Sequence, residues 1–224
     1  MKRKIAIFTG NRAEYGLQVP ILRAIDNHPN LDYFLIVSGA HLDPNFGETI
    51  NEIKEDGFNI HASINLKTGG DDLISTSNSI GEGIIKITEV INKFKPDIFL
   101  VYADRFETFA AAIASSQTNT ITAHVEGGDV TQGGALDDSV RHAITKLSHI
   151  HFSTNDQATK RILAMGEEKW RVHTVGYPGI DLINANDFSD DKAIEKKLNI
   201  DLLKPIIIFT QHSVSNKYNL VEKQ

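Results

Sequence analysis

The sequence contains acidic residues whose positions suit proton transfer. Asp104 directly follows a very apolar run, Glu126 closes another, and Asp137 and Asp138 stand at the start of an amphipathic stretch. A carboxylate at a partly dry strand end has a raised pKa, which suits a general acid or base. Helix N-capping is an equal alternative for Asp104, and capping with Arg141 as partner would explain one acid of the 137/138 pair. Proton transfer therefore stands beside capping as an interpretation of these residues.

Glu126 belongs to the stretch HVEGG, which structural roles explain poorly. Glutamate is an unfavourable strand residue and an unfavourable N-cap. Strand alternation would place His124 and Glu126 on the same face, while Gly127 and Gly128 would let a ligand approach the backbone closely. We therefore predict a functional role for Glu126.

Positively charged groups occur where α/β proteins bind anions. Arg12, in GNRAEYG, follows the first apolar run near the amino end of a predicted helix, where backbone N–H groups attract anions. Pairing with Glu14 is the structural alternative. The stretch lacks the three-glycine dinucleotide fingerprint and the Walker lysine, so it supports neither NAD nor a P-loop. His212 ends a later apolar run and would either face the first domain across a cleft or lie in an ordinary loop.

Two histidines, His149 and His151, lie two residues apart on a predicted strand and raise the question of a metal ion. No third ligand follows at a usual spacing. The chain has no cysteine, which excludes disulfides and thiolate chemistry. We predict no metal site.

A parallel sheet would have to position these residues. Short β-rich runs alternate with helical segments, and several runs are continuously apolar, which is typical of strands covered on both faces. Repeated βα units predict a doubly wound, Rossmann-like α/β fold, in which the carboxyl ends of the strands meet at one edge and ligands bind there. Strands are predicted at 4–10, 33–39, 59–65, 97–103, 120–126, 149–154, 171–177 and 205–211, and helices at 14–28, 73–94, 107–116, 138–148 and 157–165.

Composition sets further limits on function. The chain has 224 residues, of which 41% are hydrophobic and 23% charged, and its formal net charge is −6. No basic stripe offsets this charge, so we expect no nucleic-acid partner. No apolar run reaches about eighteen residues, so we expect no membrane span. The first strand is too short for a signal-peptide core, so we expect a cytoplasmic protein.

The composition changes after Tyr177 and Pro178. Residues 184–197 are polar and charged, and a further apolar run follows only at 205–211. One strand and a polar tail cannot bury a core of their own. We therefore predict a first domain over residues 1–178, and a linker with the beginning of a second domain over residues 179–224.

Motifs along nearly the whole chain resemble the hydrolysing UDP-N-acetylglucosamine 2-epimerases of sialic-acid-type and related nonulosonic-acid pathways. They are GNRAEYG, VYADRFET, HVEGGDVTQGGALDDSVRHAITKLSHIHF, VGYPGID and FTQH, in order between about residues 5 and 213. The block EGG…DDSVRHAITKLSH is specific to that family. The resemblance implies a two-domain fold like that of the GT-B glycosyltransferases, with the active site between the domains. Residues 179–224 would then begin a C-terminal nucleotide-binding domain.

The resemblance also implies a two-step reaction on a UDP-sugar substrate. Loss of the C2 proton and of UDP gives a 2-acetamidoglucal, and addition of water at C1 with return of a proton to C2 gives N-acetylmannosamine. The acid–base positions of the family correspond to Asp104, Glu126 and Asp137. No cofactor is implied, and relatives commonly form homodimers.

The same resemblance assigns substrate-binding residues. The phosphate-side contacts of the family correspond to Arg12 and His212, and Arg141 and His142 match its helix start and are assigned to substrate binding. Family members continue beyond this point with a serine- and glycine-rich segment and a glutamate that hold the uridine diphosphate. Residues 1–224 alone are therefore expected to be inactive.

Two other functions stay open at this point. A GT-B glycosyltransferase would transfer the sugar to an acceptor and keep the C2 proton unexchanged. A non-catalytic domain would bind the UDP-sugar without turnover. The sugar also stays open between UDP-N-acetylglucosamine and its 4-acetamido-4,6-dideoxy relative.

Overall fold

The computed structural model describes residues 2–66, 73–131, 136–186 and 188–210. The chain divides into two compact units, Met1–Pro178 and Gly179–Gln224. The first unit contains a seven-stranded parallel sheet in the order β3-β2-β1-β4-β5-β6-β7, so the predicted doubly wound, Rossmann-like fold is confirmed. The strands are β1 (Arg3–Thr9), β2 (Leu31–Ser38), β3 (Ile60–Ile64), β4 (Ile98–Tyr102), β5 (Ile121–Val125), β6 (Ile150–Ser153) and β7 (Val172–Thr174).

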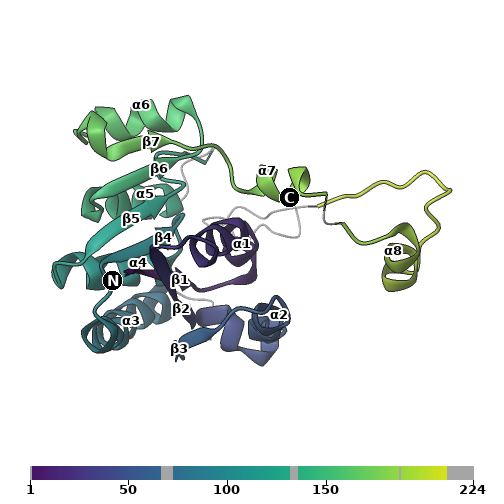
Figure 1. Ribbon diagram of the computed structural model, residues 1–224, viewed down its shortest axis with the longest axis horizontal. Helices are drawn as coiled ribbons and strands as arrows, with labels where there is room; N and C mark the ends of the chain where they lie inside the picture. The colour runs from purple at the N-terminus through teal and green to yellow at the C-terminus, as the bar shows by residue number, and fades with distance from the viewer. Residues whose placement is uncertain (1, 67–72, 132–135, 187, 211–224) are drawn as a thin grey trace. The chain divides into compact units, whose positions relative to one another are not determined.

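Helices cover both faces of this sheet. Figure 1 shows α1 and α2 on one side of the strands and α3, α4 and α5 on the other. Within the described ranges, no helix combines the length and the apolar character needed to cross a membrane. The α-helices of the first unit are α1 (Arg12–Asp26), α2 (Ile50–Glu55), α3 (Leu73–Phe94), α4 (Phe106–Gln117), α5 (Leu136–Leu147) and α6 (Asp156–Ala164), and the 3₁₀ turns are η1 (Gly39–Leu42), η2 (Pro44–Phe46) and η3 (Lys169–Arg171).

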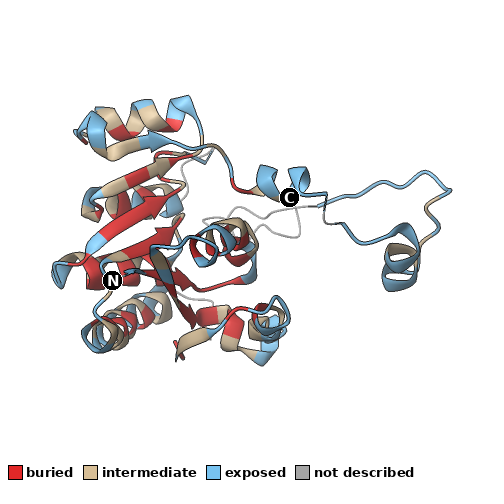
Figure 2. Ribbon diagram, viewed as in Figure 1, coloured by how far each residue is buried: buried red, intermediate tan, exposed pale blue. Residues whose placement is uncertain are grey.

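The central strands are apolar along their whole length because both of their faces are covered. Phe8, Leu35, Phe99 and Val101 are completely buried, and the buried residues follow the central strands in Figure 2. Each of these side chains stabilises the fold by about 1.5–3 kcal/mol relative to an exposed position. The sheet is therefore a rigid support for the loops at its carboxyl edge.

Helices α3 and α4 pack closely because small residues meet at their contact. Ala110, Ala111 and Ala112 of α4 are completely buried. A Cβ atom built on Gly83 of α3 would lie 2.9 Å from the Cβ of Ala110, so only glycine fits there without a shift. This contact fixes the position of α4, whose amino end stands at the carboxyl edge of the sheet.

The strand order reverses direction between β1 and β4. The chain leaves β1 towards β2 on one side and leaves β4 towards β5 on the other. In doubly wound sheets this separation opens a crevice outside the strand carboxyl ends, where ligands bind. The residues that follow β1, β4 and β5 therefore lie where a ligand would bind.

The second unit holds two short helices in its described part, α7 (Gly179–Asn184) and α8 (Asp191–Leu198). None of its described residues is buried. The strand predicted at 205–211 is wrong over its described residues, 205–210, which form neither helix nor strand. A strand needs a neighbour for its backbone hydrogen bonds, and the described part of this unit provides none.

Candidate active site

Asp104 stands just beyond β4, at the crevice. The preceding residue, Ala103, has a left-handed backbone conformation (φ 57°), which turns the chain out of the strand. The carboxylate of Asp104 forms an ion pair with the guanidinium of Arg141. Burial raises the pKa of Asp104, Arg141 lowers it, and the nearby charge of Asp137 raises it; the net effect is a raised pKa. Asp104 is therefore a carboxyl group closer to proton exchange at neutral pH than an ordinary aspartate.

Arg141 connects the acidic residues of the site. It lies on α5, is 8% exposed, and its NH1 atom is 3.4 Å from Oδ1 of Asp138. Its Nε atom is buried and has no hydrogen-bond partner within the described part of the chain. The next residue, His142, is half-buried, and its Nδ1 atom likewise lacks a partner among the described residues. Both predicted substrate-binding residues of α5 thus have a nitrogen atom without a partner among the described residues, and Arg141 also contacts Asp104 and Asp138.

The two aspartates at the start of α5 have different surroundings. Asp138 accepts a hydrogen bond from the backbone N–H of Thr131 at 2.8 Å and pairs with Arg141. Asp137 is exposed, and its charge acts on both Asp104 and Arg105. Asp138 therefore has a structural role in joining the loop to the helix, whereas Asp137 remains available to a ligand.

Glu126 lies one residue beyond β5, and its backbone is left-handed (φ 64°). Burial raises its pKa, and although Tyr102 and Arg141 lower it, the net shift is upward. Its Oε2 atom is buried without a hydrogen-bond partner among the residues described. The charge of Asp104 also raises the pKa of Glu126. A desolvated carboxyl group with an unpartnered oxygen is suited to act as acid or base.

The expectation that strand alternation pairs Glu126 with His124 is wrong, because the strand ends at Val125. His124 is completely buried and donates from Nε2 to the carbonyl of Ala103 at 2.8 Å, while its Nδ1 lies 3.1 Å from Oγ1 of Thr145. Burial lowers the pKa of His124 to about 3, so the ring is neutral. His124 therefore supports the turn after β4 and takes no part in proton exchange.

Gly127 and Gly128 have a different role from the one predicted. A Cβ atom on Gly127 would lie 2.8 Å from Nδ1 of His124, and one on Gly128 would lie 2.4 Å from the carbonyl oxygen of Ala158. Gly128 also has a left-handed backbone (φ 82°). The glycines thus allow the loop after β5 to pack against the protein itself. This packing, and not the close approach of a ligand, explains why glycine stands at both positions.

Arg12 starts α1, on the β1 side of the crevice. Asn11 caps this helix, since its Oδ1 accepts from the backbone N–H groups of Ala13 and Glu14 at 2.9 and 3.2 Å. The guanidinium of Arg12 is paired with Glu52 of α2, so the alternative that it pairs with Glu14 is wrong. This ion pair is about half exposed on both sides, and an anion that binds Arg12 has to compete with Glu52 for it.

Sequence reasoning missed two buried carboxyl groups between β1 and β4. Glu14 is 5% exposed and accepts from the backbone N–H of Gly10, and burial raises its pKa to about 8. Glu107 is completely buried and accepts two hydrogen bonds from Arg105, both 3.1 Å long. A signal was present for Glu14, because it shares the buried face of α1 with Tyr15, Gln18, Val19 and Leu22.

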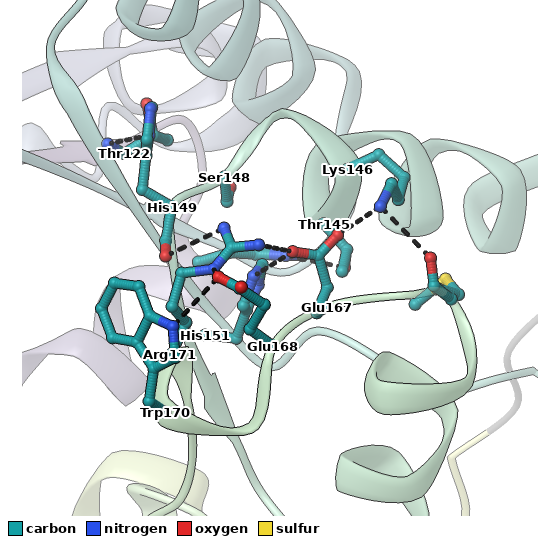
Figure 3. A network of polar contacts seen from close by, with 12 residues as sticks. Thr122, Thr145, Lys146, Ser148, His149, His151, Glu167, Glu168, Trp170 and Arg171 are labelled. Carbon is teal, nitrogen blue, oxygen red and sulfur yellow. Dashed lines mark hydrogen bonds and ion pairs between the residues drawn. The ribbon is translucent and has the colours of Figure 1, made fainter.

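The histidines considered as metal ligands have structural partners. Nε2 of His151 lies 3.2 Å from Glu167, which is also bonded to Lys146 and Arg171 (Figure 3). His149 accepts a backbone N–H of β5. Burial alone would raise the pKa of Glu167, but its cationic neighbours lower it. Among the described residues, no group of three or more His, Asp or Glu side chains could hold a metal ion.

This polar network lies away from the crevice, because Lys146 lies in the last turn of α5, which precedes β6, and Arg171 directly precedes β7. It therefore belongs to the amino-terminal side of the sheet. The remaining predicted site residue, His212, lies outside the described residues. The structure thus brings together Asp104, Glu126, Asp137 and Arg141, with His142 on the same helix as Arg141 and Arg12 across the crevice on the β1 side.

The sequence and the fold of this chain are similar to those of known proteins. The sequence profile described as UDP-N-acetylglucosamine 2-epimerase matches residues 23–223. A protein of Legionella pneumophila named UDP-N,N′-diacetylbacillosamine 2-epimerase (hydrolyzing) is 35% identical over 100% of this chain and 59% of its own length. One of Campylobacter jejuni named GDP/UDP-N,N′-diacetylbacillosamine 2-epimerase (hydrolyzing) is 34% identical over 100% of this chain and 58% of its own. The chain thus spans less than two thirds of these relatives.

Solved structures show the same fold. The UDP-GlcNAc 2-epimerase of Methanocaldococcus jannaschii, in complex with UDP-GlcNAc and UDP, superposes with a TM-score of 0.73 at 24% identity, over 87% of this chain and 53% of that one. The UDP-GlcNAc 2-epimerase of Neisseria meningitidis bound to UDP-GlcNAc superposes with a TM-score of 0.73 at 19% identity, over 88% of this chain and 54% of that one. These likenesses confirm that the first unit has the Rossmann-like fold of the first half of a GT-B-like protein.

Proposed function

This chain belongs to the UDP-N-acetylglucosamine 2-epimerase family, and we propose that it is the first part of a hydrolysing epimerase. In the proposed reaction, the C2 proton of a UDP-linked N-acetylhexosamine is removed and the C1–O bond to UDP breaks, which gives a 2-acetamidoglucal. Water then adds at C1 and a proton returns to C2 on the opposite face. The products are UDP and the C2-epimeric sugar, N-acetylmannosamine when the substrate is UDP-N-acetylglucosamine.

The observation that carries this proposal is the pair of carboxyl groups at the ends of neighbouring strands. Asp104 follows β4 and Glu126 follows β5, the two strands pair in parallel, and both groups have raised pKa values. The charge of Asp104 raises the pKa of Glu126, and the charge of Arg141 lowers the pKa of both groups. Elimination and rehydration need one group to take a proton and another to give one, and coupled carboxyl groups divide these roles.

The other site residues complete the proposed mechanism. Asp137, exposed beside Asp104, is the third acid–base group. Arg12, at the amino end of α1, releases Glu52 and binds the diphosphate instead. It thereby stabilises the charge of the leaving UDP. Arg141 and His142 use their unpartnered nitrogen atoms to bind the sugar. His212 is assigned to the phosphate side by resemblance.

The rest of the nucleotide site is proposed to come from a second domain that begins within residues 179–224. The curated relatives are considerably longer than this chain, and we expect residues 1–224 alone to show no turnover. We also propose a cytoplasmic location, which suits the cysteine-free composition, a homodimeric state, and a place in sialic-acid-type or related sugar biosynthesis.

Solvent isotope incorporation tests the reaction. The full-length protein is incubated with the UDP-sugar in D₂O, and the released sugar is analysed by proton NMR. We expect UDP in equimolar amount and one deuterium at C2 of the epimerised sugar. Release of UDP with the original hydrogen retained at C2 would mean transfer or simple hydrolysis and would overturn the proposal.

A further inference from the structure

A pocket of about 280 Å³ lies at the carboxyl edge of the sheet, near the end of β4. It lies among the segments that follow β1 and β2 and the start of α4, and Arg105, one of its walls, directly follows Asp104 in the chain. A cavity of this size holds a substituent of a sugar together with part of its ring. Its lining consists of Asn11, Arg12, Ala13, Ala40, Phe46, Thr49, Arg105 and Phe106.

Asn11, which lines this pocket, has an unused hydrogen-bond donor. The side chain is 8% exposed, and its Oδ1 is occupied by the N–H groups of Ala13 and Glu14. Because Oδ1 accepts from two N–H groups, the orientation of the amide is fixed and the other atom is Nδ2. Nδ2 has no hydrogen-bond partner in the described part of the chain. A buried amide without a partner costs stability, and a ligand carbonyl oxygen would remove that cost.

Thr49 offers an acceptor in the same pocket. It occupies the N-cap position of α2 but makes no capping hydrogen bond. Its hydroxyl instead lies 2.7 Å from Nδ1 of His41, whose Nε2 lies 3.0 Å from Oγ1 of Thr9. A hydroxyl has one donor and two lone pairs, so Thr49 keeps a free lone pair whichever partner donates. A ligand N–H can therefore bind at a fixed position.

The charges around the pocket favour a neutral group within it. Arg105 is held by two hydrogen bonds to the buried Glu107, and Arg12 is paired with Glu52. Arg12 is half exposed and able to turn towards a diphosphate outside the pocket. Arg105 cannot give up its partner as readily, since Glu107 would be left as an unpaired buried charge.

The remaining lining is apolar. Phe46 and Phe106 contribute aromatic rings, and Ala13 and Ala40 contribute methyl groups. Phe46 is 57% exposed on the short turn η2, which is a costly place for an aromatic side chain unless a ligand covers it. A methyl group suits this part of the pocket, whereas a free hydroxyl would lose its water without a partner here.

We propose that this pocket binds the acetamido group at C4 of a UDP-linked 2,4-diacetamido-2,4,6-trideoxyhexose. The carbonyl oxygen of that group accepts from Nδ2 of Asn11, its N–H donates to Oγ1 of Thr49, and its methyl group packs against Phe46. The assignment rests on the proposed function and selects the diacetamido substrate over UDP-N-acetylglucosamine, which carries a hydroxyl at C4. Relatives named for a diacetylated bacillosamine substrate are consistent with this choice.

Asn11→Asp is the sharpest test, because aspartate keeps the helix-capping oxygen and replaces the donor with a second carboxylate oxygen. In the full-length protein, kcat/KM is measured for UDP-N,N′-diacetylbacillosamine and for UDP-N-acetylglucosamine. We expect the ratio of the two to fall about tenfold, as for the loss of one hydrogen bond. Any repulsion of the diphosphate by the new carboxylate acts on both substrates and cancels in the ratio.

Phe46→Ala is the second variant, and we expect it to lower the same ratio by about tenfold through lost contact with the methyl group. Trp170→Ala removes an exposed aromatic side chain on the amino-terminal side of the sheet and should leave the ratio unchanged. An unchanged ratio in Asn11→Asp, or an equal loss for both substrates, overturns the assignment.

Equilibrium binding of the two UDP-sugars, measured by calorimetry, separates this inference from the proposed reaction. A lower binding ratio in Asn11→Asp supports the pocket even if the protein releases no UDP, and in that case only the proposed reaction fails. Equal binding of both UDP-sugars by the unsubstituted protein overturns the pocket even if the reaction is observed.

Discussion

Arg141 of α5 and Asp104 at the end of β4 form an ion pair although 37 positions separate them in the chain. The same guanidinium also pairs with Asp138 and lowers the pKa of Glu126. One buried cation thus balances carboxylates from the ends of two strands and from its own helix. Without it, these acidic groups would repel one another at the edge of the sheet.

Arg141→Met should therefore destabilise the protein. The substitution leaves Asp104 partly buried without its cation, and breaking such a pair costs about 3 kcal/mol. Urea unfolding measures the loss. In the double variant with Asp104→Asn we expect a smaller loss than the sum of the two single variants. Strict additivity would show that the two side chains are not coupled.

Glu126→Gln should reduce UDP release by at least about a hundredfold, because the amide can neither take nor give the proton. The fold should be kept, since glutamine has the same shape and Oε2 of Glu126 has no partner among the described residues. The melting temperature and UDP release are measured together. Glu168→Gln, at an exposed glutamate, is the matched control, and near-normal release by the Glu126 variant would contradict the proposed role.

Gly128→Ala should cost more stability than Gly166→Ala. Both glycines are left-handed, with φ of 82° and 89°, but a Cβ atom on Gly166 meets nothing within 4 Å, whereas one on Gly128 meets the backbone of Ala158. The Gly166 variant reports the conformational cost alone, about 1 kcal/mol. We expect the Gly128 variant to lose at least about twice that by urea unfolding. Equal losses would show that the loop moves enough to accommodate the added methyl group at Gly128.

Glu14→Gln should change how stability depends on pH. Burial raises the pKa of Glu14 to about 8 in the fold, from 4.5, so the folded state keeps a proton that the unfolded chain loses as the pH rises between these values. The free energy of unfolding therefore falls with rising pH in this window, by at most about 1.4 kcal/mol per pH unit from this group.

Glutamine cannot lose that proton, so the stability of Glu14→Gln relative to the unsubstituted protein should increase between pH 5 and pH 8. Urea unfolding at several pH values measures the difference. Glu55→Gln, at an exposed position of α2, is the charge-matched control. A constant difference across the window would mean that Glu14 is not held in its neutral form.

The edge of the sheet where the site lies could be predicted, because it depends on local patterns. The apolar run before Asp104 identifies β4, and its parallel neighbours follow from the βα repeats. Seven of the predicted strands are confirmed to within a few residues at their ends. The run at 205–211 shows the limit of the same pattern, since an apolar segment becomes a strand only where another strand pairs with it.

Contacts between distant segments could not be predicted. The pairing of Arg141 with Asp104 depends on how α5 packs over the sheet, and the sequence suggested only a local partner for this arginine. Gly127 and Gly128 were assigned to a ligand because the approach of α6 cannot be inferred from the loop alone. Glu107 gave no signal, since its hydrogen-bond partner, Arg105, resembles a surface residue in the sequence.

The crowding around Gly127 and Gly128 has a consequence for laboratory evolution of this protein. The loop that carries Glu126 accepts no side chain at Gly127 or Gly128 without a shift, because a Cβ atom at either glycine meets protein atoms. Phe46, in contrast, is exposed on the turn η2 and lines the proposed pocket. We expect a library that varies Phe46 to diversify the sugars that are accepted, while the proton-transfer groups keep their geometry.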